Sequence, residues 1–102
     1  MAKRIDGLWR QIATHLGYLK GYEIGGVKVD IDHQGMSISN REFYREHWQK
    51  EIEAWIQQIK RANLTFRQLR ARLLRSRFTE SDIQEVIDAL FEIGYDLEDY
   101  TK

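Results

Sequence analysis

The chain has 102 residues, of which 42% are hydrophobic and 31% are charged, and this composition is typical of one folded domain rather than of a disordered segment. It contains no cysteine, which excludes a disulfide framework and any thiolate metal site. Its 16 basic and 16 acidic residues cancel to a net charge of zero, but the two signs are concentrated in different segments.

The N-terminal segment predicts an amphipathic helix over residues 4–20. Its apolar residues recur at three- and four-residue spacing: Ile5, Leu8, Trp9, Ile12, Leu16 and Leu19. Polar residues interrupt the segment, and no apolar run is long enough for a signal peptide or a membrane span. We therefore expect a soluble, cytoplasmic protein with no membrane partner.

Residues 24–39 predict a β-hairpin. Two short runs alternate between apolar and polar residues, and their apolar members are Val27, Val29 and Ile31, then Met36 and Ile38. This period of two is typical of strands with one apolar face, and Gly35 in the connection favours a turn. Because two strands alone are only marginally stable, we expect the hairpin to lie on helices.

Three helix starts share one pattern, a hydroxyl residue followed three positions later by a polar residue. The pairs are Ser39 with Glu42, Thr65 with Gln68, and Thr79 with Asp82. In this pattern the hydroxyl oxygen can accept a hydrogen bond from a free backbone N–H, and the polar side chain can reach back to the cap. These starts predict a long helix over residues 40–61 and shorter helices over 66–76 and 80–93, the last ending at Gly94.

Apolar stripes on the three helices indicate which residues form the core. The stripes are Tyr44, Trp48, Ile52, Trp55, Ile56 and Ile59; then Phe66, Leu69, Leu73 and Leu74; then Ile83, Val86, Ile87, Leu90 and Phe91. The predicted fold class is α+β, mainly helical: an N-terminal helix, a β-hairpin, then a long helix and two shorter capped helices. We expect a single domain over 1–102, with a helix in 1–21, the hairpin in 24–39 and a three-helix module in 40–100.

The charges form two opposed blocks. Residues 60–77 carry seven basic residues and no acid, whereas residues 78–102 carry eight acids and one base. Such asymmetry indicates either a partner on one face or neutralisation within the fold. On a helical wheel Arg67, Arg72 and Arg75 fall on the solvent side, but Arg70 falls inside the apolar arc. We expect Arg70 to snorkel or to pair with an acid of a neighbouring helix, for which the following helix offers Glu80, Glu85, Asp88 and Glu92.

Two segments carry a resemblance to a known family. They are LTFRQLRARL at residues 64–73 and IQEVIDALFEIGY at residues 83–95, followed by the acidic DLEDY at 96–100. Together, over about residues 56–100, they resemble one three-helix module of RecX, the small bacterial modulator of the RecA recombinase. The hairpin has no counterpart in such modules. The resemblance implies binding to a recombinase filament or to a similar nucleoprotein surface.

No catalytic, cofactor or metal site is identified. The three histidines lie on different predicted elements, without a second histidine at ligand spacing. Asp30, Asp32 and His33 cluster at the hairpin tip, but alternation places the two aspartates on the solvated face of a strand. No nucleophile stands in a recognisable arrangement with a base. We expect a protein that is not an enzyme and that needs no cofactor or metal.

The function predicted from the sequence is that of a small regulatory or inhibitory protein that binds a protein partner through a mixed-charge helical surface. The predicted contact residues are Lys60, Arg61, Arg67, Arg72, Arg75 and Arg77, with a secondary acidic face of Glu85, Asp88 and Glu92. One alternative is nucleic-acid binding by residues 60–77. The other is a homo-oligomer formed by the long helix through Trp48 and Trp55.

Overall fold

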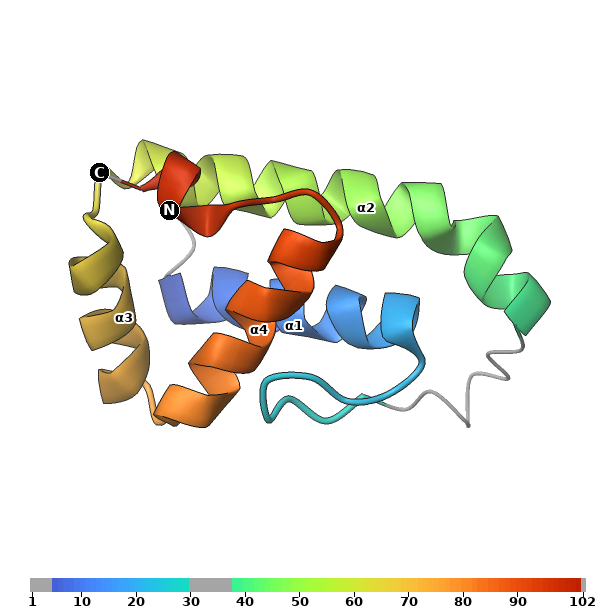
Figure 1. Ribbon diagram of the computed structural model, residues 1–102, viewed down its shortest axis with the longest axis horizontal. Coiled ribbons are helices and arrows are strands. Elements are labelled where there is room, and N and C mark those ends of the chain that lie inside the picture. Colours follow the sequence, from blue (N-terminus) through green and yellow to red (C-terminus); the bar gives the residue numbers. More distant parts are fainter. Residues whose placement is uncertain (1–4, 30–37, 102) are drawn as a thin grey trace.

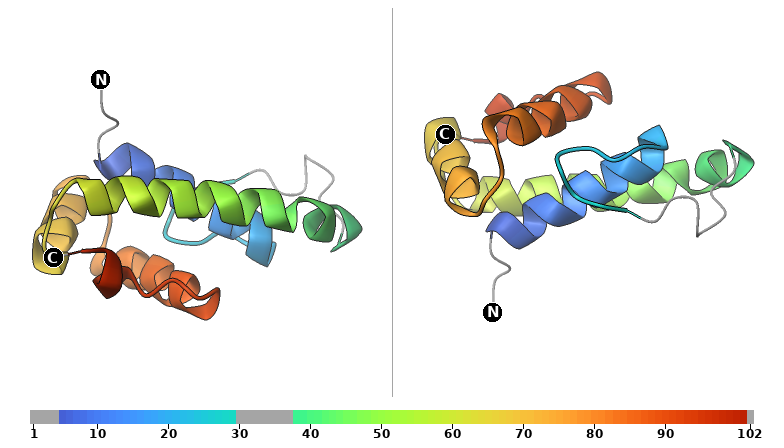
Figure 2. Two further views of the ribbon diagram at one scale, coloured as in Figure 1. Left: turned by 90° about the horizontal axis from the view of Figure 1, so that it is seen from above. Right: turned by 90° about the horizontal axis from the view of Figure 1, so that it is seen from below.

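A computed structural model describes residues 5–29 and 38–101, and the part described is built from helices (Figure 1). The elements in chain order are α1 (Ile5–Lys20), α2 (Ile38–Arg61), α3 (Phe66–Arg75), α4 (Glu80–Glu92) and the short 3₁₀ helix η1 (Leu97–Tyr100). Helices α1 and α2 lie side by side and antiparallel, α3 crosses one end of this pair, and α4 runs obliquely over α1 (Figures 1 and 2). η1 packs on α2 and on α4.

The core lies between the α1–α2 pair and the two shorter helices. From α1 it takes Leu8, Trp9, Ile12 and Leu16; from α2, Trp48, Ile52, Trp55, Ile56 and Ile59; from α3 and α4, Leu69, Leu73, Ile83, Val86 and Leu90. Each fully buried aliphatic side chain stabilises the fold by roughly 1.5–3 kcal/mol relative to an exposed one. The sequence pattern predicted these residues, and the structure confirms them.

Local capping fixes where α3 and α4 begin. The Thr65 Oγ1 accepts a hydrogen bond from the Gln68 N–H at 3.0 Å, and the Thr65 N–H donates to the Gln68 side chain at 2.9 Å. Thr79 and Asp82 form the same reciprocal pair at 3.0 and 3.1 Å. Both capping boxes were predicted. The predicted cap at Ser39 is wrong, because α2 already begins at Ile38.

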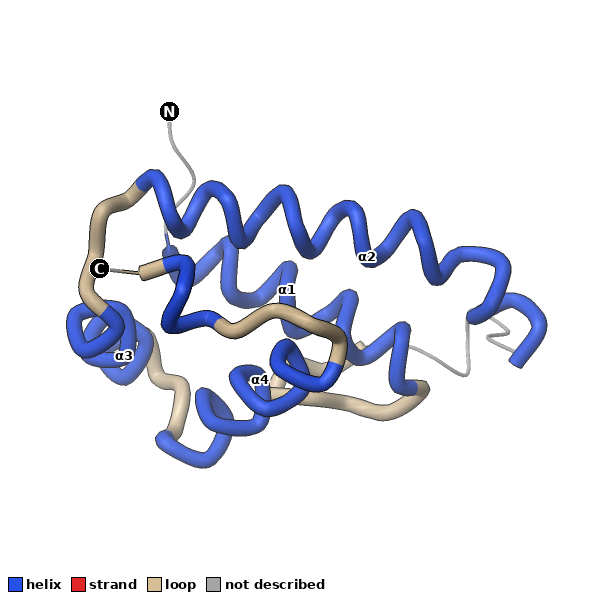
Figure 3. The backbone as a smooth tube through the Cα atoms, turned by 45° about the horizontal axis from the view of Figure 1, so that its top comes forward, coloured by secondary structure: helices blue, strands red, loops and turns tan. Residues whose placement is uncertain are grey.

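The predicted β-hairpin is wrong, and with it the α+β fold class. No strand occurs in the residues that the structure describes (Figure 3). Residues 21–29 form a turn with one isolated bridge between Ile24 and Val27, Ile38 lies in a helix, and the residues between 30 and 37 fall outside the described part.

Val27 and Val29, the described apolar residues of the predicted strand, pack against the helical core and against α1 instead of against a partner strand. A Cβ added at Gly17 of α1 would meet the Val29 side chain at 3.3 Å, so Val29 lies on α1. On the other side, a Cβ at Gly25 would meet Val86 of α4 at 2.5 Å, so the turn lies directly on that helix. Contact with two helices therefore accounts for a pattern that resembles a strand.

Three residues of the predicted apolar stripes are exposed. They are Tyr44 at 45%, Leu74 at 40% and Phe91 at 66% relative exposure. Each has the spacing of a core residue, but it lies at the edge of its stripe, where no neighbouring element covers it.

Candidate partner-binding surface

Helix α3 presents a basic outer face because its two buried leucines fix its rotation. Leu69 and Leu73 point into the core, and this places Arg67, Arg72 and Arg75 on the opposite, exposed side. Lys60 and Arg61 at the end of α2 and Arg77 after α3 are exposed as well. We call these six residues, Lys60, Arg61, Arg67, Arg72, Arg75 and Arg77, the basic surface.

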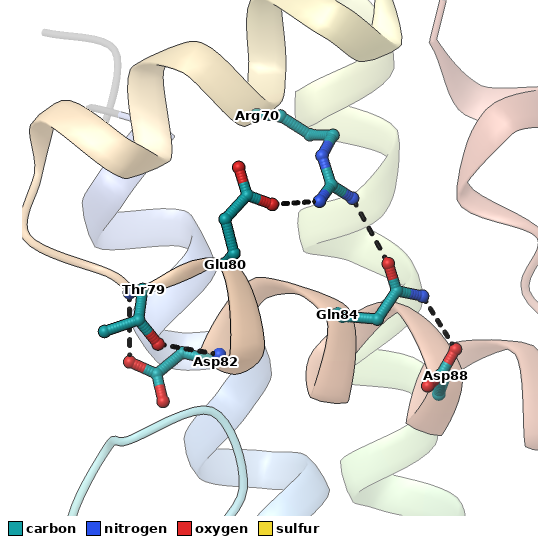
Figure 4. A network of polar contacts seen from close by, with 6 residues as sticks. All are labelled: Arg70, Thr79, Glu80, Asp82, Gln84 and Asp88. Carbon is teal, nitrogen blue, oxygen red and sulfur yellow. Dashed lines mark hydrogen bonds and ion pairs between the residues drawn. The ribbon is translucent and has the colours of Figure 1, made fainter.

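Arg70 is the one arginine of α3 that the fold uses. Its guanidinium pairs with the Glu80 carboxylate and donates to the Gln84 side-chain oxygen at 3.3 Å, and Gln84 in turn donates to Asp88 at 2.9 Å (Figure 4). The guanidinium carbon also lies 5.7 Å from the centre of the Phe66 ring. The side chain is only 26% exposed, so the predicted pairing with an acid of the next helix is confirmed.

The arginines of the basic surface make no comparable contact. Among the described residues, no ion pair involves Arg61, Arg67, Arg72, Arg75 or Arg77. Lys60 lies 5.9 Å from the centre of the Tyr100 ring, which is a weak cation–π distance for an exposed amine. The charge of this surface is therefore not neutralised within the described part of the chain.

Arg77 occupies a backbone conformation that usually belongs to glycine. Its φ of 74° closes α3 in a left-handed turn, in which the Phe78 N–H donates to the Leu73 carbonyl and the Arg77 N–H donates to the Leu74 carbonyl, both at 3.3 Å. Helix α4 ends in the same way, but with Gly94 at φ 97°. A residue with a Cβ costs roughly 1 kcal/mol more than glycine in this region.

A shallow depression of about 430 Å³ adjoins the basic surface. Its lining residues are Ala62, Leu64, Gln68, Ala71, Arg72 and Arg75. The first two belong to the α2–α3 connection and the rest to the outer face of α3. We call this the α3 depression. Three of its six lining residues, Ala62, Leu64 and Ala71, are apolar, and we call these three its apolar floor; Gln68, Arg72 and Arg75 line the rest.

Four lining residues of the α3 depression were not predicted: Ala62, Leu64, Gln68 and Ala71. One signal in the sequence points to Ala71. Ala71 has Arg67 four residues before it and Arg75 four residues after it, so a small side chain lies on an exposed helix face between two long ones. Such a position leaves a hollow.

The secondary acidic face on α4 is exposed but largely engaged. The Glu85 carboxylate accepts a hydrogen bond from the buried Gly25 N–H at 2.6 Å, Glu92 pairs with Lys20, and Asp88 accepts from Gln84 at 2.9 Å. The Glu85 contact fixes α4 to the turn after α1, and the Glu92 contact fixes it to the end of α1, whereas the Asp88 contact lies within α4. The structure therefore gives this face a role inside the fold.

Five aromatic rings form a row between α1 and α2. The sequence of contacts is Tyr44 to Trp48 at 5.7 Å, Trp48 to Tyr18 at 5.2 Å, Tyr18 to His15 at 5.5 Å, and His15 to Trp55 at 4.7 Å, measured between ring centres. Trp48 and Trp55, the residues expected to pair with a second copy, are buried within this row.

Two side chains beside this packing have shifted pKa values. Burial lowers the pKa of His15, which the Gln11 carbonyl and Glu51 partly oppose. Burial also raises the pKa of Tyr95, with Glu53 and Tyr100 acting in the same direction. Neither group lies at the basic surface.

The described residues contain no group of three or more acidic or histidine side chains placed to hold a metal ion. Asp30, Asp32 and His33 lie outside the described part. In the part of the chain that the structure covers, every helix is too short or too polar to cross a membrane.

Comparisons of the chain with protein-family models, with curated proteins and with solved structures found no match. The resemblance to RecX modules therefore stays a prediction.

Proposed function

We propose that this protein is a small, non-catalytic regulatory or inhibitory protein that binds a protein partner through the basic surface. One observation carries the proposal. The arginines at positions 61, 67, 72, 75 and 77 are exposed and lack an ion-pair partner among the described residues, whereas the neighbouring acids of α4 are used to hold the fold together. A group of charges that does not stabilise the fold is available for a second molecule.

The lining of the α3 depression favours a protein over a nucleic acid as partner. Ala62, Leu64 and Ala71 offer apolar contacts to a side chain, and no aromatic ring lines the depression on which a base could stack.

The resemblance to RecX modules makes a recombinase filament, or another nucleoprotein complex, the first partner to test. That resemblance covers about residues 56–100, a range that contains all six residues of the basic surface.

Affinity capture from the native host tests the proposal. Three baits are compared. They are the wild-type chain, the α3 variant with Arg67→Glu, Arg72→Glu and Arg75→Glu, and a control variant. The control makes the same change of charge at three exposed residues elsewhere, with Lys28→Glu, Arg45→Glu and Lys50→Glu. We expect proteins that bind the wild type and the control but not the α3 variant. Thermal melting confirms beforehand that all three baits are folded.

The same capture separates the alternatives. Recovery of the same proteins by the α3 variant would overturn the proposal. Loss of all captured proteins after nuclease treatment of the lysate would replace the protein partner with a nucleic acid.

A further inference from the structure

We infer that the partner presents to α3 an acidic amphipathic helix, with one apolar side chain seated over Ala71 and carboxylates about one helical turn to either side. This inference rests on the proposed function, since it specifies the chemistry of the segment that the basic surface would bind. The supporting observation is the arrangement of side chains on the exposed face of α3, where small and apolar residues lie between basic ones.

The first step concerns the row formed by Arg67, Ala71 and Arg75. These residues are four positions apart, so they stand one above the other on one side of α3, and the two arginines are separated by about 12 Å along the axis. Ala71 is exposed between them, and with Ala62 and Leu64 it forms the floor of the α3 depression. The depression thus has its apolar floor at the centre of the row.

The second step is that this floor extends beyond the depression. Leu74 is three residues after Ala71 on the same helix and is 40% exposed, which is unusual for a residue with the spacing of a core position. Leu74 and Ala71 are neighbours on α3, and the same helix carries Arg67 and Arg75. A purely polar, polyacidic segment would leave these apolar side chains without a contact, so the partner needs an apolar side chain as well.

The third step is the charge of the partner. No acidic residue is among those that line the α3 depression, while Arg72 and Arg75 stand at its edge and Arg67 lies one helical turn from Ala71. Guanidinium groups bind carboxylates with two parallel hydrogen bonds, and their aliphatic stems cover neighbouring apolar surface. Carboxylates beside an apolar side chain are the complementary arrangement.

The fourth step is the conformation of the partner. The described residues offer no strand whose edge an extended peptide could join, so binding by strand addition has no template there. A second helix, however, can approach α3 closely where the contact residue is small, and Ala71 is such a residue. Acids seven or eight positions apart on that helix span about 10.5–12 Å, which matches the separation of Arg67 and Arg75.

A peptide-display selection tests the inference with the full-length protein as the immobilised target. The probe is a library of random 16-residue peptides. We expect the enriched peptides to share one large apolar residue with Asp or Glu three or four positions before and after it. The best enriched peptide is then synthesised, and its Kd is measured by fluorescence anisotropy against the wild type and the variants.

Two variants with a matched control make the measurement specific. Ala71→Gln fills the hollow with a polar side chain, and Ala54→Gln makes the same change at an exposed alanine of α2. We expect Ala71→Gln and the charge reversal Arg72→Glu with Arg75→Glu each to weaken binding by roughly tenfold or more, and Ala54→Gln to leave it unchanged. Alanine in place of the apolar residue of the peptide should weaken binding to a similar extent.

The outcomes distinguish the inference from the proposed function. No enrichment of acidic peptides, or binding that is insensitive to Ala71→Gln, would overturn the inference. Suppose that the inference fails in this way, but that reversal of Arg67, Arg72 and Arg75 still abolishes capture of the native partner. The proposed function then stands, and only the acidic amphipathic helix is rejected. If neither the peptide nor the native partner responds to the arginine reversals, both fail.

Discussion

Residues 60–77 and residues 78–102 carry opposite charges of equal size, and the fold uses the two groups in different ways. On the acidic side, Glu80, Glu85 and Glu92 each contact a group on another element, and Asp82 caps its own helix. On the basic side, among the described residues, Arg70 has an ion pair with another element, and Lys60 has only a cation–π contact of 5.9 Å with Tyr100. The difference shows that a charge count does not reveal which block stabilises the fold and which has few partners among the described residues.

The largest expected effect concerns the contact of α4 with the turn after α1. Gly25 has a φ of 71°, and a Cβ there would meet the Val86 side chain at 2.5 Å. We expect Gly25→Ala to lower the free energy of unfolding by about 2–4 kcal/mol, from left-handed strain and overpacking together. Urea titration followed by circular dichroism measures this change.

Gly7→Ala provides the matched control for Gly25→Ala. Gly7 lies inside α1, and nothing is within 4 Å of its added Cβ. This substitution should raise stability by roughly 0.5–1 kcal/mol, because alanine favours the helix. Equal effects at the two glycines would show that α4 does not pack on the turn as described.

The next effect compares one residue from each charged block. Glu85→Ala deprives the buried Gly25 N–H of its acceptor, and we expect a loss of about 1–2 kcal/mol. Arg75→Ala removes an exposed side chain without an ion pair among the described residues, and we expect a change within about 0.5 kcal/mol. Denaturant titration of the two variants under identical conditions measures both changes in the free energy of unfolding. A loss at Arg75 as large as that at Glu85 would mean that the basic surface stabilises the fold after all.

A smaller effect is expected at Arg77, and with the opposite sign. Glycine adopts the φ of 74° without strain, so Arg77→Gly should stabilise the protein by up to about 1 kcal/mol. Thermal melting measures the gain, and Arg77→Ala, which keeps the Cβ but removes the charge, is the control. A stabilised Arg77→Gly variant that binds its partner less well would show that the arginine is retained for binding rather than for folding.

The smallest effect concerns pH and arises at His15, outside both charged blocks. Burial lowers the pKa of His15, so the unfolded chain binds the proton more tightly than the folded one. Stability should therefore fall as the pH is lowered through the ordinary histidine value of 6.5.

Urea titrations at about pH 7.5 and about pH 5.5 measure this dependence. The wild type should lose more stability on acidification than His15→Gln. An identical pH dependence in wild type and His15→Gln would assign the loss to other groups.

Most of the helical structure was predictable because its signals are local. The Thr65–Gln68 and Thr79–Asp82 pairs lie within four residues of sequence, and so does the turn at Gly94. The hairpin was mispredicted because Val27 and Val29 alternate for a tertiary reason: Val27 packs on the helical core and Val29 lies on Gly17 of α1. The exposure of Leu74 could not be predicted either, because periodicity identifies an apolar face but not whether another element covers it.

The basic residues of the candidate surface were predicted, but the α3 depression was not. A helical wheel orients Arg72 and Arg75 correctly because Leu69 and Leu73 define the buried side of α3. The floor, however, combines Ala71 with Ala62 and Leu64 of a connecting segment, and only the three-dimensional path of the chain brings these together.

The length of α2 has a practical consequence for measuring binding. Its 24 residues extend about 36 Å, close to the 38 Å longest dimension of the molecule, and its C-terminal end adjoins the α3 depression. A thiol introduced at the exposed Arg45 would be the only one in the chain, and it would stand about 24 Å from Arg61 along a continuous helix. A fluorophore or a surface tether attached there would leave α3 unobstructed, so α2 can serve as a built-in spacer between the point of attachment and the basic surface.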